Sequence, residues 1–163
     1  MRSAKAVLTG SFGVGKTSLF NRFIYQTFSD AYKMTVGVRV EKKVIFSNGE
    51  QINIILWDIE GEAQQQKVPT TYFQGASSIV YVFDLTRPST YLNLPSNISY
   101  LQKISPTATV KIIGNKSDLV SIKDIQKIQV QLPYPIDLIT SAKSGENVET
   151  LFQSIGHAVS LSN

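Results

Sequence analysis

Apolar residues gather in short runs along the chain, and the spacing of these runs predicts a β-sheet. Segments rich in valine, isoleucine and leucine recur six times, and their residue types and lengths are typical of strands. They cover residues 4–10 (AKAVLTG), 37–46 (GVRVEKKVIF), 51–58 (QINIILWD), 77–85 (SSIVYVFDL), 109–115 (TVKIIGN) and 135–142 (PIDLITSA). The sequence therefore predicts six strands.

Helical spacing lies between most of these runs. In three segments apolar residues three and four positions apart form one face of a helix. These faces are Leu19, Phe20, Phe23 and Ile24; Leu94, Ile98 and Leu101; and Val148, Leu151, Phe152, Ile155 and Val159. A fourth helix is predicted through Ile125, Ile128 and Leu132, because Ser121 and Asp124 have the spacing of a capping box. Pro95 interrupts the second segment, so we expect that helix to begin at or after the proline.

One connection differs from the others and sets the fold class. Asn48 and Gly49 separate two alternating strands, and this pair is typical of a two-residue hairpin turn. Two strands should therefore be antiparallel in an otherwise parallel sheet. We expect an α/β fold with a mostly parallel six-stranded sheet and helices on both faces. Ligands of such sheets bind at the carboxyl ends of the strands.

The loop after the first run carries the strongest chemical signal. Residues 10–17 read GSFGVGKT and fit the pattern G-x-x-x-x-G-K-[ST] between a strand and an amphipathic helix. Glycines allow the backbone to wrap closely, so that successive N–H groups point into one concavity at the positive end of the helix. Such a concavity binds phosphate. The expected donors are Gly13, Val14, Gly15, Lys16, Thr17 and Ser18.

Two side chains of this loop have further roles. Lys16 would reach the β and γ phosphates, and the Thr17 hydroxyl would be a ligand of Mg²⁺, which prefers oxygen donors. The alternative is a glycine-rich turn with a solvated lysine. The flanking strand and helix favour the phosphate site.

A second motif indicates which base accompanies the phosphates. Asn115, Lys116 and Asp118 belong to the sequence NKSD at the end of the fifth run. The Asp118 carboxylate can accept two hydrogen bonds from the N1 and N2 donors of guanine, and adenine lacks this donor pair. A buried carboxylate left without those donors is unfavourable, so the site would reject adenine. The alternative is a surface turn, because four residues make a weak pattern alone.

Composition excludes several other classes of protein. With 163 residues, 42% hydrophobic and 17% charged, the chain has ordinary globular composition, and we expect a single domain over residues 1–163. Cysteine is absent from the sequence, which removes thiol chemistry, disulfides and cysteine-based zinc sites. Its net charge of +4 is spread along the chain, so nucleic-acid binding is not indicated. Because no apolar run is long enough to cross a bilayer, we expect a cytoplasmic protein.

These motifs resemble the Ras superfamily of small GTP-binding proteins, and the Rab branch is nearest. TVGVRV (35–40) resembles the first switch segment, T-I-G-V-x-F, and ILWDIEGEA (55–63) resembles W-D-T-A-G-Q-E of the second. YFQGASSIVYVFDLT (72–86) is similar to the Rab stretch that begins Y-Y-R-G-A, and TSAKSGENV (140–148) resembles the E-T-S-A-K element. The resemblance covers essentially the whole chain. It implies the P-loop NTPase fold of the small GTPase type.

The resemblance also implies roles for further residues. Thr35 would reach Mg²⁺ when the γ phosphate is present, Asp58 would hold the ion through a water, and Gly61 would donate its N–H to the γ phosphate. Tyr32 would either close over the phosphates or pack as an ordinary loop residue. The base pocket would be completed by Phe28, stacked on guanine, and by Ser141, Ala142 and Lys143. Hydrolysis would use Lys16, Thr35, Gly61 and the residue at position 62.

Position 62 departs from the family pattern. Glu62 stands where the family has a glutamine that orients the attacking water. A carboxylate only accepts hydrogen bonds and is repelled by the γ phosphate. Three outcomes stay open: Glu62 turns away and hydrolysis is slow, it positions water when protonated or bridged by a cation, or it serves as a base. We favour slow hydrolysis.

Other departures concern partners. Phe12 replaces a small residue beside the γ phosphate, and its bulk argues against entry of an arginine finger; alternatively its ring lies outward. Ala63 and Gln74 replace a glutamate and an arginine, which puts Rab-type exchange-factor contacts in doubt. The sequence lacks the terminal cysteines by which Rab proteins are prenylated, so either the protein is not lipidated or a tail is missing. The only histidine, His157, is expected at the surface.

Two functions follow from these observations. The first is a Mg²⁺-dependent GTPase that cycles slowly between GTP and GDP forms, and the second is a GTP-binding interaction module that does not hydrolyse the nucleotide. A phosphate-loop kinase is disfavoured by the NKSD motif. We expect a monomer whose effectors and regulators dock on the switch segments. The expected docking residues are Val36, Val38, Trp57 and Tyr72, which could equally belong to the core.

Overall fold

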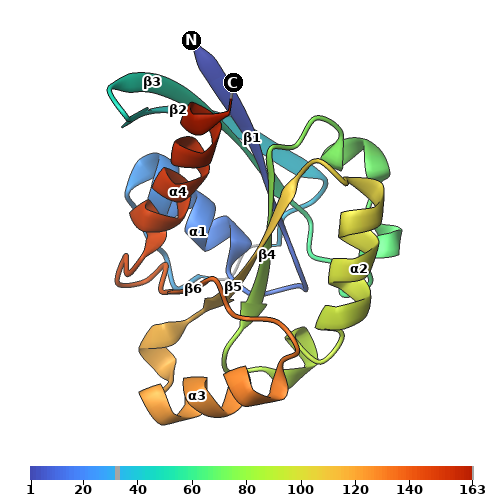
Figure 1. Cartoon of the computed structure of the whole chain (residues 1–163). Coiled ribbons are helices and arrows are strands. Elements are labelled where there is room, and N and C mark those ends of the chain that lie inside the picture. Colours follow the sequence, from blue (N-terminus) through green and yellow to red (C-terminus); the bar gives the residue numbers. More distant parts are fainter. Residues whose placement is uncertain (32–33, 163) are drawn as a thin grey trace.

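A computed structural model describes residues 1–31 and 34–162, and these residues form a mixed sheet with helices on both faces (Figure 1). The sheet has the order β2-β3-β1-β4-β5-β6. Its strands are β1 (Arg2–Thr9), β2 (Val38–Ser47), β3 (Glu50–Ile59), β4 (Ser78–Asp84), β5 (Thr109–Asn115) and β6 (Leu138–Thr140). The six predicted strands are confirmed.

The hairpin between β2 and β3 gives the sheet its antiparallel pair. β2 pairs antiparallel with β3, while the pairs β1–β3, β1–β4, β4–β5 and β5–β6 are parallel. Asn48 and Gly49 have φ angles of 51° and 78°, and both left-handed values are those of a type I′ turn. The mostly parallel sheet with one antiparallel hairpin is confirmed.

Two apolar cores lie on opposite faces of the sheet. Helices α1 (Lys16–Tyr25) and α4 (Val148–Leu161) cover one face, and α2 (Leu94–Ile104) and α3 (Ile122–Gln131) cover the other (Figure 1). β4 is buried along its whole length because Val80 and Val82 face the first core while Ile79, Tyr81 and Phe83 face the second. Burial on both faces explains its continuous apolar sequence.

The shorter helical turns connect these elements. They are 3₁₀ turns, labelled η1 (Gln65–Lys67), η2 (Thr70–Phe73), η3 (Pro88–Thr90) and η4 (Ser117–Leu119). The capping box of α3 is formed, with Ser121 Oγ accepting the Asp124 N–H and Asp124 accepting the Ser121 N–H. Within the described part of the chain, no helix has the length and apolarity required to cross a membrane.

Two element boundaries differ from the sequence prediction. α2 begins at Leu94, one residue before Pro95. A proline is tolerated in the first turn of a helix because the N–H groups there have no partner within the helix. The sixth strand was predicted over residues 135–142 but covers only Leu138–Thr140. Before it, the Asp137 carboxylate accepts the Ile112 N–H at 2.6 Å, so a side chain replaces a backbone ladder bond there.

Candidate functional site

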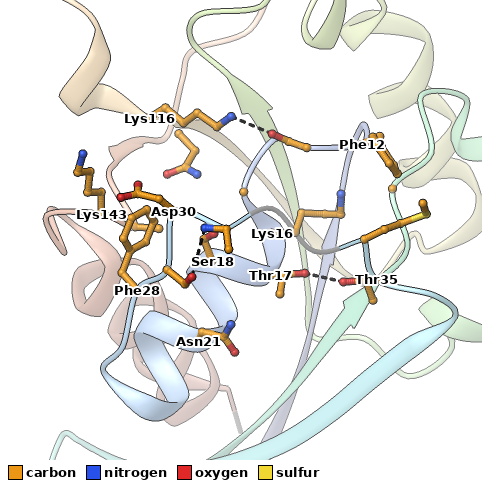
Figure 2. Close-up of a pocket in the computed structure, with 18 of the residues that line it drawn as sticks. Phe12, Lys16, Thr17, Ser18, Asn21, Phe28, Asp30, Thr35, Lys116 and Lys143 are labelled. Carbon is orange, nitrogen blue, oxygen red and sulfur yellow. Dashed lines mark hydrogen bonds between the residues drawn. The ribbon is translucent and has the colours of Figure 1, made fainter.

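A cavity of about 840 Å³ opens at the carboxyl ends of the parallel strands, where the sequence places the glycine-rich loop. This volume is ordinary for a small-molecule site. The walls come from the loop at residues 10–15, the start of α1, the segment between α1 and β2, and the loops after β5 and β6. Figure 2 shows Lys16, Thr17 and Thr35 at one end and Phe28, Lys116 and Lys143 at the other.

Side chains from β5 and from the segments that follow β4 and β5 bind three successive carbonyl groups of the glycine-rich loop. Arg87 NH1 donates to the Phe12 carbonyl at 2.8 Å, Lys116 Nζ to the Gly13 carbonyl at 2.9 Å, and Asn115 Nδ2 to the Val14 carbonyl at 3.0 Å. In a trans peptide the N–H points away from the C=O. Because these carbonyls are bound by side chains, the N–H of the residue that follows each one is fixed in the opposite direction. The loop is therefore held in a shape suited to an anion.

Lys16 lies buried beside this loop. Its Nζ donates to the Ser11 carbonyl at 2.9 Å and the Gly10 carbonyl at 3.2 Å, and the residue is 5% exposed. Burial lowers the pKa of the Lys16 ammonium to about 8, although the negative charge of Asp58 partly raises it. An anion in the cavity would favour the charged form of this lysine. Buried cations are usually paired, so the site is suited to a negatively charged ligand.

Close backbone approaches explain two of the glycines. Gly15 has φ of 102°, and a Cβ at this position would lie 2.2 Å from Asn115 Nδ2. Gly61 contacts the backbone of Phe12, because a Cβ there would lie 2.5 Å from the Phe12 Cα. A larger residue at position 15 would displace the Asn115 side chain, and one at position 61 would push the second switch segment away from the glycine-rich loop.

Three oxygen-bearing side chains meet at the start of α1. Thr17 Oγ1 lies 2.5 Å from Thr35 Oγ1 (Figure 2). It donates to Asp58 Oδ2 at 2.7 Å. The other oxygen, Asp58 Oδ1, is buried and has no hydrogen-bond partner among the described residues. Burial raises the pKa of the Asp58 carboxyl, while the Thr17 hydrogen bond and the Lys16 charge lower it. This oxygen donor set fits a hard divalent cation such as Mg²⁺.

Hydrogen bonds to two loops build the opposite end of the cavity. Ser141 Oγ donates to Asp118 Oδ1 at 2.7 Å, which fixes the carboxylate predicted to recognise guanine. Arg22 Nε donates to the Ala142 carbonyl at 2.7 Å, and its NH2 donates to the Lys143 carbonyl at 2.5 Å. Arg22 of α1 therefore holds the loop that follows β6 through two of its carbonyl groups.

The NKSD motif is also connected to the sheet. Asn115 accepts a hydrogen bond from Thr140, and Lys116 forms an ion pair with the buried Asp84 at 2.8 Å. Since Lys116 also binds the Gly13 carbonyl, one side chain connects the base motif with the phosphate loop. Phe28 and Lys143 line the cavity beside Asp118.

Glu62 does not line the cavity formed by the described residues. Its N–H donates to the Gly10 carbonyl at 3.0 Å, and its carboxylate accepts the Gln64 N–H at 3.2 Å. The carboxylate is thus bonded to its own segment. Phe12, by contrast, lines the cavity and is 43% exposed. Tyr32 lies outside the described residues, so its expected role stays a prediction.

The residues expected to contact partners divide into two kinds. Val36 and Val38 are exposed, whereas Trp57 and Tyr72 are half-buried against the second core and their rings lie 6.3 Å apart. Lys5 Nζ lies 3.8 Å from the centre of the Trp57 ring, a cation–π distance. His157 is at the surface, as predicted.

Sequence reasoning missed several residues that hold this site. Asp84 ends a strand otherwise free of charged residues, and a charge at the carboxyl end of a buried strand could have identified it. Arg22 and Arg87 gave no such signal, because each binds carbonyls of a loop distant in sequence.

The comparisons with known proteins agree with this geometry. The Ras family model matches residues 5–161. Ras-related protein Rab-12 of human, mouse and rat is 32% identical over 154 residues, which is 91% of this chain and 63% of each relative. Ras-related protein Rab-1A of Dictyostelium discoideum is 32% identical over 159 residues, 93% of this chain and 77% of that protein. The chain spans less than two thirds of the length of Rab-12. It belongs to the Ras family and is a Rab-like member of it.

Proposed function

We propose that this protein is a guanine-nucleotide switch that binds GTP and GDP with Mg²⁺ and hydrolyses GTP slowly. The observation that carries the proposal is the loop whose carbonyls at residues 12, 13 and 14 are fixed by side chains of other segments, next to the buried Lys16. This arrangement supports binding of a phosphate chain by backbone N–H groups and one ammonium. The Rab relatives support the same function by similarity.

Recognition of guanine is assigned to Asp118. Its carboxylate accepts the two guanine N–H donors, while the hydrogen bond from Ser141 holds it in place. Phe28 stacks on the base, and the Ala142 N–H donates to the guanine oxygen. Asp118 is exposed in the structure, so its carboxylate becomes buried only when a base covers it. ATP is rejected because adenine would cover the carboxylate without supplying the two donors.

The phosphate end performs the chemistry. Thr17, Thr35 and Asp58 would hold Mg²⁺, which when bound would neutralise charge on the phosphates. Lys16 stabilises charge on the β and γ phosphates. The Thr35 and Gly61 segments close on the γ phosphate and are released after hydrolysis, which changes the surface available to a partner.

Slow hydrolysis follows from Glu62. A glutamine can donate to a phosphate oxygen and accept from the attacking water, but a carboxylate only accepts. The hydrogen bond from the Gln64 N–H supports a resting position turned away from the γ phosphate. We expect Glu62→Gln to raise the rate of phosphate release about tenfold.

A non-hydrolysing GTP-binding module is the second candidate, and the same contact of Glu62 favours it. Phosphate release in a single turnover with GTP and Mg²⁺ separates the two functions. A measurable first-order release supports the GTPase. A flat trace over many hours, with intact GTP still bound, supports the binding module.

Partners and location are part of the proposal. Effectors and regulators dock on the switch segments, where Val36 and Val38 are exposed and Trp57 and Tyr72 are partly so. The protein acts as a cytoplasmic monomer, with peripheral attachment to membranes if a lipidated tail follows residue 163.

The direct test of the proposal is the identity of the co-purified nucleotide. Protein purified without added nucleotide is denatured, and the released nucleotide is identified by chromatography. GDP or GTP at about one equivalent is expected. An adenine nucleotide, or none after purification in Mg²⁺, would contradict the proposal.

A further inference from the structure

One buried charge beside the nucleotide cavity has no part in the proposed chemistry. Asp84 ends β4, is 0% exposed, and is the only charged residue of that strand. It does not line the cavity formed by the described residues. Because a buried charge is retained only when it is paired or hydrogen-bonded, the partners of Asp84 indicate what it does.

Each oxygen of the Asp84 carboxylate has its own partner. Oδ1 accepts the Thr86 N–H at 2.8 Å and the Thr86 hydroxyl at 2.6 Å, and these two bonds fix the direction of the carboxylate. Oδ2 lies 2.8 Å from Lys116 Nζ and forms an ion pair with it. Among the described residues, no other cation pairs with this carboxylate.

The same ammonium also binds the glycine-rich loop. Lys116 Nζ donates to the Gly13 carbonyl at 2.9 Å (Figure 2). The Lys116 backbone has left-handed angles, φ 70° and ψ 39°, which are unfavourable for a residue other than glycine. The contacts of its side chain therefore help to hold the turn that leads to Asp118.

We propose that Asp84 is a positioning residue for the nucleotide site and that it acts through Lys116. Because Asp84 is buried, movement of the Lys116 ammonium would leave an unpaired carboxylate in the interior, which is strongly unfavourable. The ammonium is therefore kept where it binds the Gly13 carbonyl and holds the base motif. Asp84 thus supports both ends of the cavity without contacting the nucleotide. This inference rests on the proposed function.

The ion pair predicts a reversal of sign in a double variant. Lys116→Met removes the ammonium and leaves the Asp84 carboxylate buried without a cation. A further change, Asp84→Asn, removes that charge at nearly constant volume, so it should restore part of what was lost. In the unaltered protein the same change is harmful, because an amide donor then faces the ammonium. Replacing a residue with only a general structural role would be harmful in both backgrounds.

Dissociation of a fluorescent GDP analogue tests this reversal. We expect Asp84→Asn to raise the dissociation rate about tenfold and Lys116→Met to raise it about 30-fold. The double variant should show a rise of about tenfold, rather than the roughly 300-fold of two independent losses. A rise of about 300-fold in the double variant, or an unchanged rate in Asp84→Asn, would overturn the inference.

Asp137→Asn is the matched control. It makes the same chemical change at a carboxylate that accepts the Ile112 N–H before β6 and does not line the cavity. This variant should lower the unfolding temperature but leave the GDP dissociation rate within about a factor of two. A rise as large as that of Asp84→Asn would mean that general loss of stability speeds dissociation, and the positioning role would be wrong.

Thermal unfolding without nucleotide shows whether each variant folds. If Asp84→Asn does not fold, Thr86→Val decides, because it keeps the charge and removes the hydroxyl bond to Oδ1. It should raise the dissociation rate about threefold, and an unchanged rate would contradict the inference. If the unaltered protein retains no guanine nucleotide, the proposed function is wrong and the inference falls with it. If Asp84→Asn retains GDP as well as the unaltered protein does, only the inference is wrong.

Discussion

The two ends of the cavity are built differently. At the phosphate end, Lys16 is buried, and two side chains of the NKSD motif hold the carbonyls of the glycine-rich loop. At the base end, Asp118 and Lys143 are exposed, and one side-chain hydrogen bond fixes the carboxylate. A buried charge and aligned N–H groups provide affinity for any nucleotide, whereas an oriented carboxylate provides discrimination between bases. The comparison predicts that variants at the two ends fail in different ways.

The largest effect is expected at Lys16. Lys16→Ala should weaken GTP and GDP by about 100-fold or more, roughly 3 kcal/mol, because a charge-assisted contact with phosphate is lost in a buried site. Dissociation of a fluorescent nucleotide measures the change. Retention within a factor of three of the original protein would mean that the phosphates bind elsewhere.

Asp118→Ala should act through the base alone. We expect about a 50-fold loss of affinity for guanine nucleotides with little change for ATP, because only guanine supplies the two donors. Competition between GTP and ATP measures both values in one experiment. Equal losses for the two nucleotides would show that Asp118 supports the fold of the loop rather than base recognition.

Arg22→Ala tests the scaffold of the base end. Its two bonds to the carbonyls of Ala142 and Lys143 are short, and the first is partly buried while the second is exposed, so their loss should raise the GDP dissociation rate about tenfold. Arg22→Lys provides the control, since it keeps the charge but not the pair of donors. An unchanged rate in Arg22→Ala would show that the loop holds its shape without this residue.

A smaller effect is expected from Arg87, which binds a loop carbonyl at the phosphate end as Arg22 does at the base end. Arg87→Ala removes one exposed bond to the Phe12 carbonyl, and we expect GTP dissociation to rise about threefold. Residue 12 contacts Gly61, which is expected to bind the γ phosphate, so GDP dissociation should change less. An equal rise for both nucleotides would contradict a role at the γ end.

The sequence predicted most of what local pattern determines. Strand periodicity, the Asn48 and Gly49 turn, the capping box and the glycine-rich loop each depend on residues close together in the chain. Arg22 and Arg87 could not be predicted in this way, because their partners lie 120 and 75 residues away. The buried Gln65 gave no signal either, since a glutamine in a polar segment is usually exposed.

The boundaries that differ have local physical causes. Pro95 was expected to delay α2, but the first turn of a helix tolerates proline. The sixth strand is short because the Asp137 side chain takes the place of a ladder bond. At position 62 the sequence shows that a carboxylate replaces the amide of a glutamine, but it does not show where the carboxylate points. In the structure, that direction depends on the hydrogen bond from the Gln64 N–H.

Calorimetry on protein stripped of nucleotide, with Mg²⁺ present, tests the central claim most directly. The account predicts that GTP binds at least about 50-fold more tightly than ATP, because a carboxylate that pairs with guanine rejects adenine. The same titration with Lys16→Ala should lose most of the GTP affinity. Equal affinities for GTP and ATP, or no binding of either, would contradict the account.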